Sequence, residues 1–125
     1  MNGNRVLIDT NALIYFFNGH PKAIEALDGN ILYLSVITEI ELLSYNGLTE
    51  ESIKGIKKFL KECSVIDVIP KIKEFTIDLK KAKKIKLPDA IIAATAQFLK
   101  IEFVTFDKGF VNVPNLDLVL LDFDR

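Results

Sequence analysis

The sequence is poor in the residue types that build disulfides, zinc clusters and bidentate anion clamps. Its 125 residues include one cysteine, one histidine, two arginines and no tryptophan. The single cysteine, Cys63, excludes an internal disulfide and a thiolate zinc site, and its place between a helical and a strand-like pattern favours a structural thiol. Because arginine is so scarce, an anionic partner would have to be held by lysine side chains and backbone groups.

Long apolar runs and leader features are also missing. Uncharged runs such as Ala90–Leu99 are far shorter than the roughly 20 residues that a membrane-spanning helix needs. The opening MNGNRVLIDT lacks the basic and apolar regions of a secretory signal. We therefore expect a cytoplasmic protein without a membrane partner. With 50% hydrophobic and 26% charged residues, the chain fits a single folded domain over residues 1–125.

The net charge is small, but the charges are unevenly distributed. The whole chain carries −1, whereas the segment Lys54–Lys86 holds eleven lysines and four acids, which leaves −8 for the remainder. Two interpretations stay open at this point. The segment is either a surface that binds nucleic acid or the solvated side of two lysine-rich helices.

Strand-like and helical patterns alternate along the chain. Short apolar runs predict strands at residues 5–8, 31–35, 65–68, 103–105 and 118–121. Apolar residues at helical spacing predict helices over 11–17 and 22–27, and further helices that begin at Thr38, Glu50, Pro70 and Pro88. This alternation predicts an α/β fold, a three-layer α/β/α sandwich with a mostly parallel central sheet of about five strands. Ligands of such folds bind at the carboxyl ends of the strands.

Four acidic residues follow the predicted strands at that same edge: Asp9, Glu41, Asp89 and Asp107. Each has an ordinary explanation when it is taken singly. Aspartate is a preferred helix cap, and an acid in the first turn suits the helix dipole. Thr38 and Glu41 have the spacing of a capping box, and Asp107 lies in the turn-forming sequence FDKG.

Taken together, the four acids predict a metal site. Two carboxylates about 4 Å apart repel by about 4 kcal/mol at an effective dielectric constant of about 20, so a cluster needs protons or a cation. Only Lys108 adjoins one of the four in sequence. Oxygen ligands without histidine or cysteine select hard cations such as Mg²⁺ or Mn²⁺, and such sites activate water and neutralise a phosphodiester under attack. We therefore expect a metal-dependent, hydrolytic phosphoryl-transfer site.

Four blocks of the sequence resemble the signature blocks of one known family. The segments VLIDTNALIYFF, LSVITEIELL, KLPDAIIAATA and FVTFDKGF look like those of PIN-domain ribonucleases, and most of all like the small toxins of VapBC-type toxin–antitoxin pairs. The resemblance spans about Val6 to Phe110. It implies a Rossmann-like PIN fold in which Asp9, Glu41, Asp89 and Asp107 bind one or two Mg²⁺ or Mn²⁺ ions. It also implies endoribonuclease activity, with hydrolysis of RNA by in-line attack of water and no covalent intermediate.

The resemblance extends to neighbouring residues and to partners. It implies that carboxylates or waters are oriented by Thr10, Asn11, Thr38 and Thr105. In the block T-x-x-E-L the matching acid is Glu41 rather than Glu39, which points about 200° away around a helix. The expected partners are an RNA substrate, a second copy in a homodimer, and a small antitoxin whose C-terminal segment lies across the acidic groove.

Other functions stay open from the sequence. The chain fits a PIN nuclease that processes RNA outside a toxin pair, or a non-catalytic PIN domain that acts as a scaffold or binding module. A response-regulator receiver has the same size and class, but its phospho-acceptor strand belongs in mid-domain, whereas DLVLLDFD lies at the C-terminus. A haloacid-dehalogenase-like phosphatase needs D-x-D after the first strand, and this chain has Asn11 at the third position.

Overall fold

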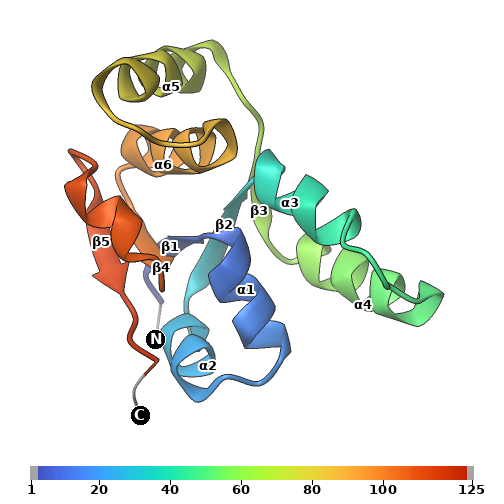
Figure 1. The fold of residues 1–125 in the computed structure, drawn as a ribbon. Coiled ribbons are helices and arrows are strands. Elements are labelled where there is room, and N and C mark those ends of the chain that lie inside the picture. Colours follow the sequence, from blue (N-terminus) through green and yellow to red (C-terminus); the bar gives the residue numbers. More distant parts are fainter. Residues whose placement is uncertain (1–2, 124–125) are drawn as a thin grey trace.

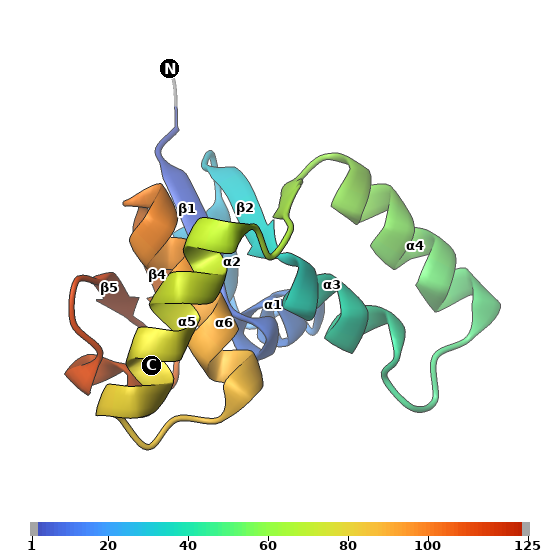
Figure 2. The same ribbon diagram turned by 90° about the horizontal axis from the view of Figure 1, so that it is seen from above.

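A central sheet separates two groups of helices in the computed structural model, which describes residues 3–123 (Figure 1 and Figure 2). In chain order the elements are β1 Arg5–Ile8, α1 Thr10–Phe17, α2 Pro21–Leu27, β2 Ile31–Ser35, α3 Val36–Leu43, α4 Glu50–Lys61, β3 Ser64–Ile66, α5 Pro70–Ala82, α6 Leu87–Leu99, β4 Glu102–Thr105, the 3₁₀ helix η1 Lys108–Asn112 and β5 Asp117–Leu120. Over residues 3–123, none of the helices has the length and apolarity that a membrane crossing requires.

The sheet has five strands in the order β3-β2-β1-β4-β5, and every neighbouring pair is parallel. The chain moves outward from β1 through β2 to β3, and then crosses to the other side of β1 to form β4 and β5. The direction of winding therefore reverses between β1 and β4. In an open parallel sheet this reversal leaves a crevice beyond the carboxyl ends of the two strands, where ligands bind.

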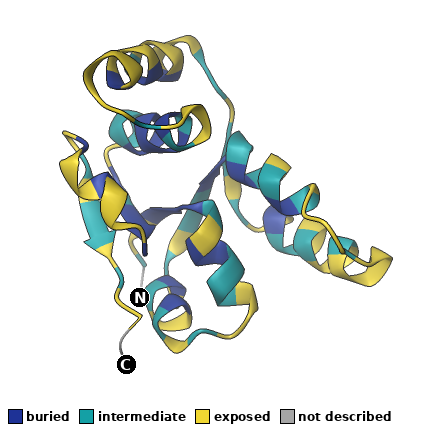
Figure 3. Cartoon of the chain, viewed as in Figure 1, coloured by how far each residue is buried: buried dark blue, intermediate teal, exposed yellow. Residues whose placement is uncertain are grey.

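The two faces of the sheet are covered by different helices. Leu7 of β1 belongs to a core cluster that includes Ile72 of α5 and Ile92 of α6. Its neighbours Val6 and Ile8 belong to a second cluster with α1, α2 and α3. Successive side chains of a strand point to opposite faces, so β1 is buried on both sides. The expected α/β/α sandwich is confirmed, and Figure 3 shows burial concentrated toward the sheet with exposed outer sides of α4 and α5.

Helix α6 is deeply buried beside the switch point, which is the place between β1 and β4 where the direction of winding reverses. Ala90, Ala93 and Ala94 are fully buried, and Ile92 is nearly so. Small side chains let the helix approach the sheet and α5 closely, because no bulky group holds the backbones apart. The acid in the first turn of α6 is therefore carried by a tightly packed element.

The predicted start of the third helix is wrong. We expected a helix from Thr38 with a Thr38–Glu41 capping box, but α3 begins at Val36. The strand β2 runs directly into the helix, and its last residue, Ser35, is the cap: the Ser35 hydroxyl accepts from the Ile37 amide at 3.0 Å. Thr38 therefore lies inside the first turn, where it is fully buried and its hydroxyl is available for the site.

Smaller differences concern other boundaries. Strand β3 covers Ser64–Ile66 rather than 65–68, and α6 begins at Leu87, one residue before Pro88. Asp9 does cap α1, which accordingly begins at Thr10.

The cysteine and the histidine both pack structurally. Cys63 is half-buried, its thiol donates to the Phe59 carbonyl oxygen at 3.5 Å, and burial raises its pKa to about 11. His20 lies edge-on against the rings of Tyr15 and Phe106, with centroids 5.9 and 5.1 Å away. A thiol with a pKa this high is not a nucleophile at neutral pH, so the structural role expected for Cys63 is supported.

We predict that the end of α6 can be stabilised by one substitution. Lys100 caps this helix in the left-handed conformation, with φ of 57°. This conformation costs a side-chain-bearing residue roughly 1–2 kcal/mol, and glycine avoids the cost while adding some chain entropy. Lys100→Gly should raise the free energy of unfolding by about 1 kcal/mol in urea denaturation.

The matched control is the same substitution inside a helix. Lys57→Gly, in the exposed interior of α4, should lower the free energy of unfolding by about 1 kcal/mol. A Lys100→Gly protein that is less stable than the parent would contradict the role assigned to the left-handed cap.

Candidate active site

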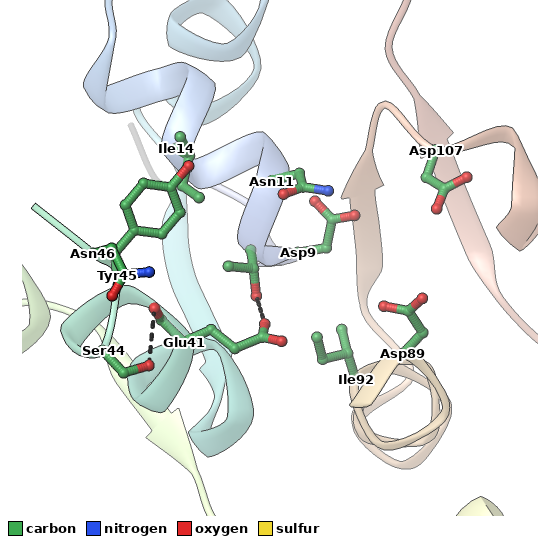
Figure 4. Close-up of a pocket in the computed structure, with 11 residues that line it drawn as sticks. Asp9, Asn11, Ile14, Glu41, Ser44, Tyr45, Asn46, Asp89, Ile92 and Asp107 are labelled. Atoms are coloured by element: carbon green, nitrogen blue, oxygen red, sulfur yellow. Dashed lines mark hydrogen bonds between the residues drawn. The ribbon is translucent and has the colours of Figure 1, made fainter. Parts of the chain in front are cut away.

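The four predicted acids line one hollow beyond the carboxyl ends of β1, β2 and β4 (Figure 4). We call this cavity of about 630 Å³ the acidic hollow. Asp9 directly follows β1, Glu41 lies on the helix after β2, Asp89 lies in the first turn of α6, and Asp107 follows β4. Because β1 lies between β2 and β4, acids nearly one hundred positions apart in sequence meet at the switch point.

Asp9 is the buried centre of the group, with only 5% of its surface exposed. Its Oδ1 accepts from the Ala12 amide at 2.9 Å, and its Oδ2 accepts from the Thr105 hydroxyl at 2.5 Å. Burial raises the pKa of this carboxyl to about 6. The two hydrogen bonds oppose the rise, and the negative charges of Asp107 and Asp89 add to it.

Two threonines hold Glu41. The Thr10 hydroxyl donates to the Glu41 carboxylate at 2.5 Å, and the hydroxyl oxygens of Thr10 and Thr38 lie 3.0 Å apart. Thr10 has one hydroxyl hydrogen, which the carboxylate takes, so the buried Thr38 hydroxyl donates to Thr10. This chain of hydroxyls ties α3 to the first residue of α1.

Asp107 and Asp9 are linked through one threonine. The Thr105 hydroxyl donates to Asp9 and also accepts from the Asp107 backbone amide at 2.9 Å. The Asp107 side chain is exposed and caps η1 by accepting from the Gly109 amide at 2.7 Å. Helix capping therefore explains Asp9 and Asp107 in part, but Glu41 and Asp89 cap no helix.

The pKa of Asp89 is raised by burial and then by the charges of Asp107 and Glu41. Lys86 lowers it. In sequence only Lys108 adjoins one of the acids, but in the fold Lys86, three residues before Asp89 at the start of α6, acts on Asp89 as well. The mutual effects among the acids show that they share one electrostatic environment.

The structure places the predicted neighbouring residues at or beside the four acids. The hydroxyls of Thr10, Thr38 and Thr105 form hydrogen bonds within the site. Asn11 lines the acidic hollow. Tyr45 and Asn46 also line the hollow and were not expected. The available signal was their position: the polar turn SYNG follows the helix that carries Glu41.

The donor set has the chemistry of a hard-cation site. Four carboxylates supply only oxygen ligands, and a cation would offset the repulsion and burial that raise the pKa values of Asp9 and Asp89. Figure 4 shows Glu41 and Asp89 pointing toward the space beside Asp9, whereas the Asp107 carboxylate turns away from it and accepts from the Gly109 amide. As the side chains stand, however, no three acidic, histidine or cysteine residues between positions 3 and 123 form a group that could hold a metal ion. Metal binding therefore stays a prediction that needs the side chains to turn inward.

The family of the chain is shown by its sequence. The family model of the PIN domain matches residues 6–116, and the chain belongs to the PIN domain family. The resemblance of the four sequence blocks is thereby confirmed. No curated protein matches the chain.

Several solved structures are similar over most of their length. A toxin–antitoxin complex from Klebsiella pneumoniae contains a chain 32% identical to this one, with a TM-score of 0.80 over 91% of this chain and 95% of that one. VapBC2 from Rickettsia felis, bound to a DNA fragment from its promoter, gives 27% identity and a TM-score of 0.79 over 94% and 99%. A chain of VapBC-1 from nontypeable Haemophilus influenzae is 26% identical, with a TM-score of 0.77 over 97% of this chain and 99% of that one.

We predict that Asp9 makes the stability of the metal-free protein depend on pH. Its pKa is about 6 in the folded state and 3.8 as a reference for the unfolded chain. Between these values the folded state binds a proton that the unfolded state does not, so the free energy of unfolding falls as the pH rises from about 4 to 6. The loss attributable to Asp9 is at most about 3 kcal/mol.

Urea denaturation in EDTA across this pH range tests the assignment. Asp9→Asn should remove most of the fall, while Asp117→Asn, an exposed change on β5, should leave it in place. An undiminished fall in the Asp9→Asn protein would show that the buried carboxyl is not its source.

Proposed function

We propose that this PIN-domain protein is a metal-dependent endoribonuclease that hydrolyses RNA phosphodiester bonds and serves as the toxin of a type II toxin–antitoxin pair. The observation that carries the nuclease function is the convergence of Asp9, Glu41, Asp89 and Asp107 in one hollow at the switch point of the sheet. The similarity to chains of solved toxin–antitoxin complexes supports the toxin role.

In this proposal the four carboxylates hold Mg²⁺ or Mn²⁺, which would lower the pKa of a water molecule and offset the charge of the phosphate under attack. The protein's own contribution is to keep the carboxylates in place. Thr105 fixes one oxygen of Asp9 and the backbone of Asp107 at once. Thr10, supported by Thr38, fixes Glu41.

The lining of the acidic hollow supports direct hydrolysis rather than a covalent intermediate. The hydroxyls of Thr10 and Thr105 donate to carboxylates, and the Ser44 hydroxyl donates to the Ile40 carbonyl oxygen at 2.7 Å. No cysteine or histidine lines this hollow. The carboxylates that accept these hydroxyl protons are weak bases and are the ligands proposed for the cation, so a water molecule activated by that cation would be the better nucleophile.

An apolar groove beside the acidic hollow supports the proposed antitoxin partner. This groove, about 530 Å³, runs between α1, α3 and α4 and is lined by Ile14, Phe17, Leu42, Tyr45, Leu48 and Ile56 among others. Ile14 and Tyr45 also line the acidic hollow, so the two cavities adjoin at these side chains. A partner segment with apolar side chains in the groove and an arginine among the carboxylates would block the site.

We predict that RNA cleavage needs Mg²⁺ or Mn²⁺ together with the carboxylates of the acidic hollow. Changing residues that support metal ligands costs about 10–100-fold, so Asp9→Asn or Glu41→Gln should lower kcat by at least about 100-fold. The measurement is cleavage of labelled RNA with and without EDTA. Glu39→Gln is the matched control, because this acid lies on the same helix outside the acidic hollow, and its activity should stay near that of the parent.

Cleavage that persists in EDTA or in the Asp9→Asn protein would overturn the assignment. Equal losses for Glu39→Gln and Glu41→Gln would show that the wrong side of α3 was chosen. Calorimetric titration with Mn²⁺ distinguishes the non-catalytic alternative, because a scaffold without a metal site should give no heat of binding.

We predict that the apolar groove can be closed without harming catalysis. Gly55 of α4 lines the groove, and a Cβ built there meets nothing within 4 Å. Gly55→Phe should fill the space and abolish inhibition by the product of a short reading frame beside the gene, while RNA cleavage persists. The control Gly55→Ala should keep inhibition and stabilise the helix by about 1 kcal/mol. Undiminished inhibition of Gly55→Phe would place the partner elsewhere.

A further inference from the structure

A second hollow adjoins the acidic hollow on the side of α6 and η1. Asp89 and Asp107 line both, so the two cavities meet at these carboxylates. The second hollow has a volume of about 510 Å³, and three of its lining residues are Lys83, Lys84 and Lys86. We call it the lysine hollow. The sign of the charge therefore changes from one cavity to the next across the two shared acids.

The three lysines are charged groups that take part in no close ion pair in the described part of the chain. All three are exposed, and none forms an ion pair within 4.0 Å in the described part of the chain. Lys86 offsets part of the rise in the pKa of the Asp89 carboxyl, but it lies beyond the range of an ion pair with that group. A group of three unpaired cations beside a cavity is electrostatically suited to an anion.

The backbone that carries these lysines is held in place. The segment is the connection between α5 and α6, and the Lys80 ammonium donates to the Ile85 carbonyl oxygen at 2.7 Å. The Ile85 side chain packs against the core between α5 and α6, and the Lys86 carbonyl oxygen accepts from the Ala90 amide at 2.9 Å. The lysine side chains therefore start from fixed positions beside the acids.

The walls of the lysine hollow favour a nucleic-acid backbone over a base. Phe110 lines this cavity but is only 3% exposed, so its ring offers no face for stacking. On the opposite side of the acids, by contrast, Tyr45 is 57% exposed and lies beside Asn46. Lysine contacts to phosphates position a strand without reading its sequence, whereas exposed aromatic and amide groups can contact bases.

We propose that Lys83, Lys84 and Lys86 form a phosphate-binding subsite that holds the RNA backbone on one side of the bond to be cleaved. The inference rests on the proposed ribonuclease function and adds to it how the strand is placed. The phosphate under attack lies at the acids, and the phosphates that flank it on the α6 side lie along the lysines. The strand then runs from the acidic hollow into the lysine hollow.

The test measures binding apart from cleavage. In an Asp9→Asn background, which cannot cleave, the affinity for a labelled single-stranded RNA is measured by fluorescence anisotropy at several salt concentrations. For single strands, the logarithm of the binding constant falls linearly with the logarithm of the salt concentration, and each lost phosphate contact makes this slope shallower by about 0.7. Lys83→Gln/Lys84→Gln should therefore reduce the slope by about 1.4 and weaken binding about 25-fold at 0.1 M salt.

The matched control removes the same charge from another part of the protein. Lys54→Gln/Lys57→Gln changes two exposed lysines of α4, which lies well away from the connection between α5 and α6 (Figure 2). Its salt slope should stay at the parent value. If both pairs reduce the slope equally, the effect is one of net charge and the subsite is overturned.

Cleavage by the metal-loaded protein with intact Asp9 gives the second measurement. Lys83→Gln/Lys84→Gln should raise KM for RNA by a similar factor and leave kcat unchanged, because these lysines touch flanking phosphates rather than the reacting one. An unchanged KM overturns the subsite while the ribonuclease function stands. A loss of inhibition by a protein partner with normal RNA affinity overturns it too and assigns the lysines to that partner.

Failure of the proposed function has a different signature. If the protein with intact Asp9 neither cleaves RNA with Mg²⁺ or Mn²⁺ nor binds it with a salt-dependent affinity, the function and the subsite both fail. If it cleaves RNA and the two lysine pairs behave alike, only the subsite fails.

Discussion

The buried carboxylate of Asp9 is the constraint on which the site depends. Burial disfavours its charge, and two donors, the Ala12 amide and the Thr105 hydroxyl, hold it nonetheless. The first donor belongs to the helix that follows β1, and the second belongs to the neighbouring strand β4. One side chain thus joins the start of α1 to the end of β4 at the switch point. The other acids take their places around it.

Two further cavities adjoin the acidic hollow, and each of the three has a different chemistry. The acidic hollow shares Asp89 and Asp107 with the lysine hollow and shares Ile14 and Tyr45 with the apolar groove. In the proposed function, RNA occupies the acidic and lysine hollows, whereas the antitoxin occupies the groove and the acids. Substrate and partner then compete for the same carboxylates, and this competition is a direct physical basis for inhibition.

Local patterns predicted most of the fold because they reflect local physics. The strand β1 reads as an uninterrupted apolar run because both of its faces are buried, and the helix α4 shows its apolar stripe because one side only is covered. The start of α3 was predicted wrongly because Ser35 ends a strand and caps a helix at once, so no polar break separates the two. Lys86 was missed beside Asp89 because its approach depends on where α6 begins.

By itself, the sequence determined which acids could form a site: Asp9, Glu41, Asp89 and Asp107 follow strands or open helices, and parallel strands bring their carboxyl ends to one edge. Only the tertiary structure decided what surrounds them. The strand order places β4 beside β1, so that Thr105 reaches Asp9 across 96 positions. It also places the lysine hollow and the apolar groove on either side. Such contacts depend on packing between distant segments, and no local pattern of residues encodes them.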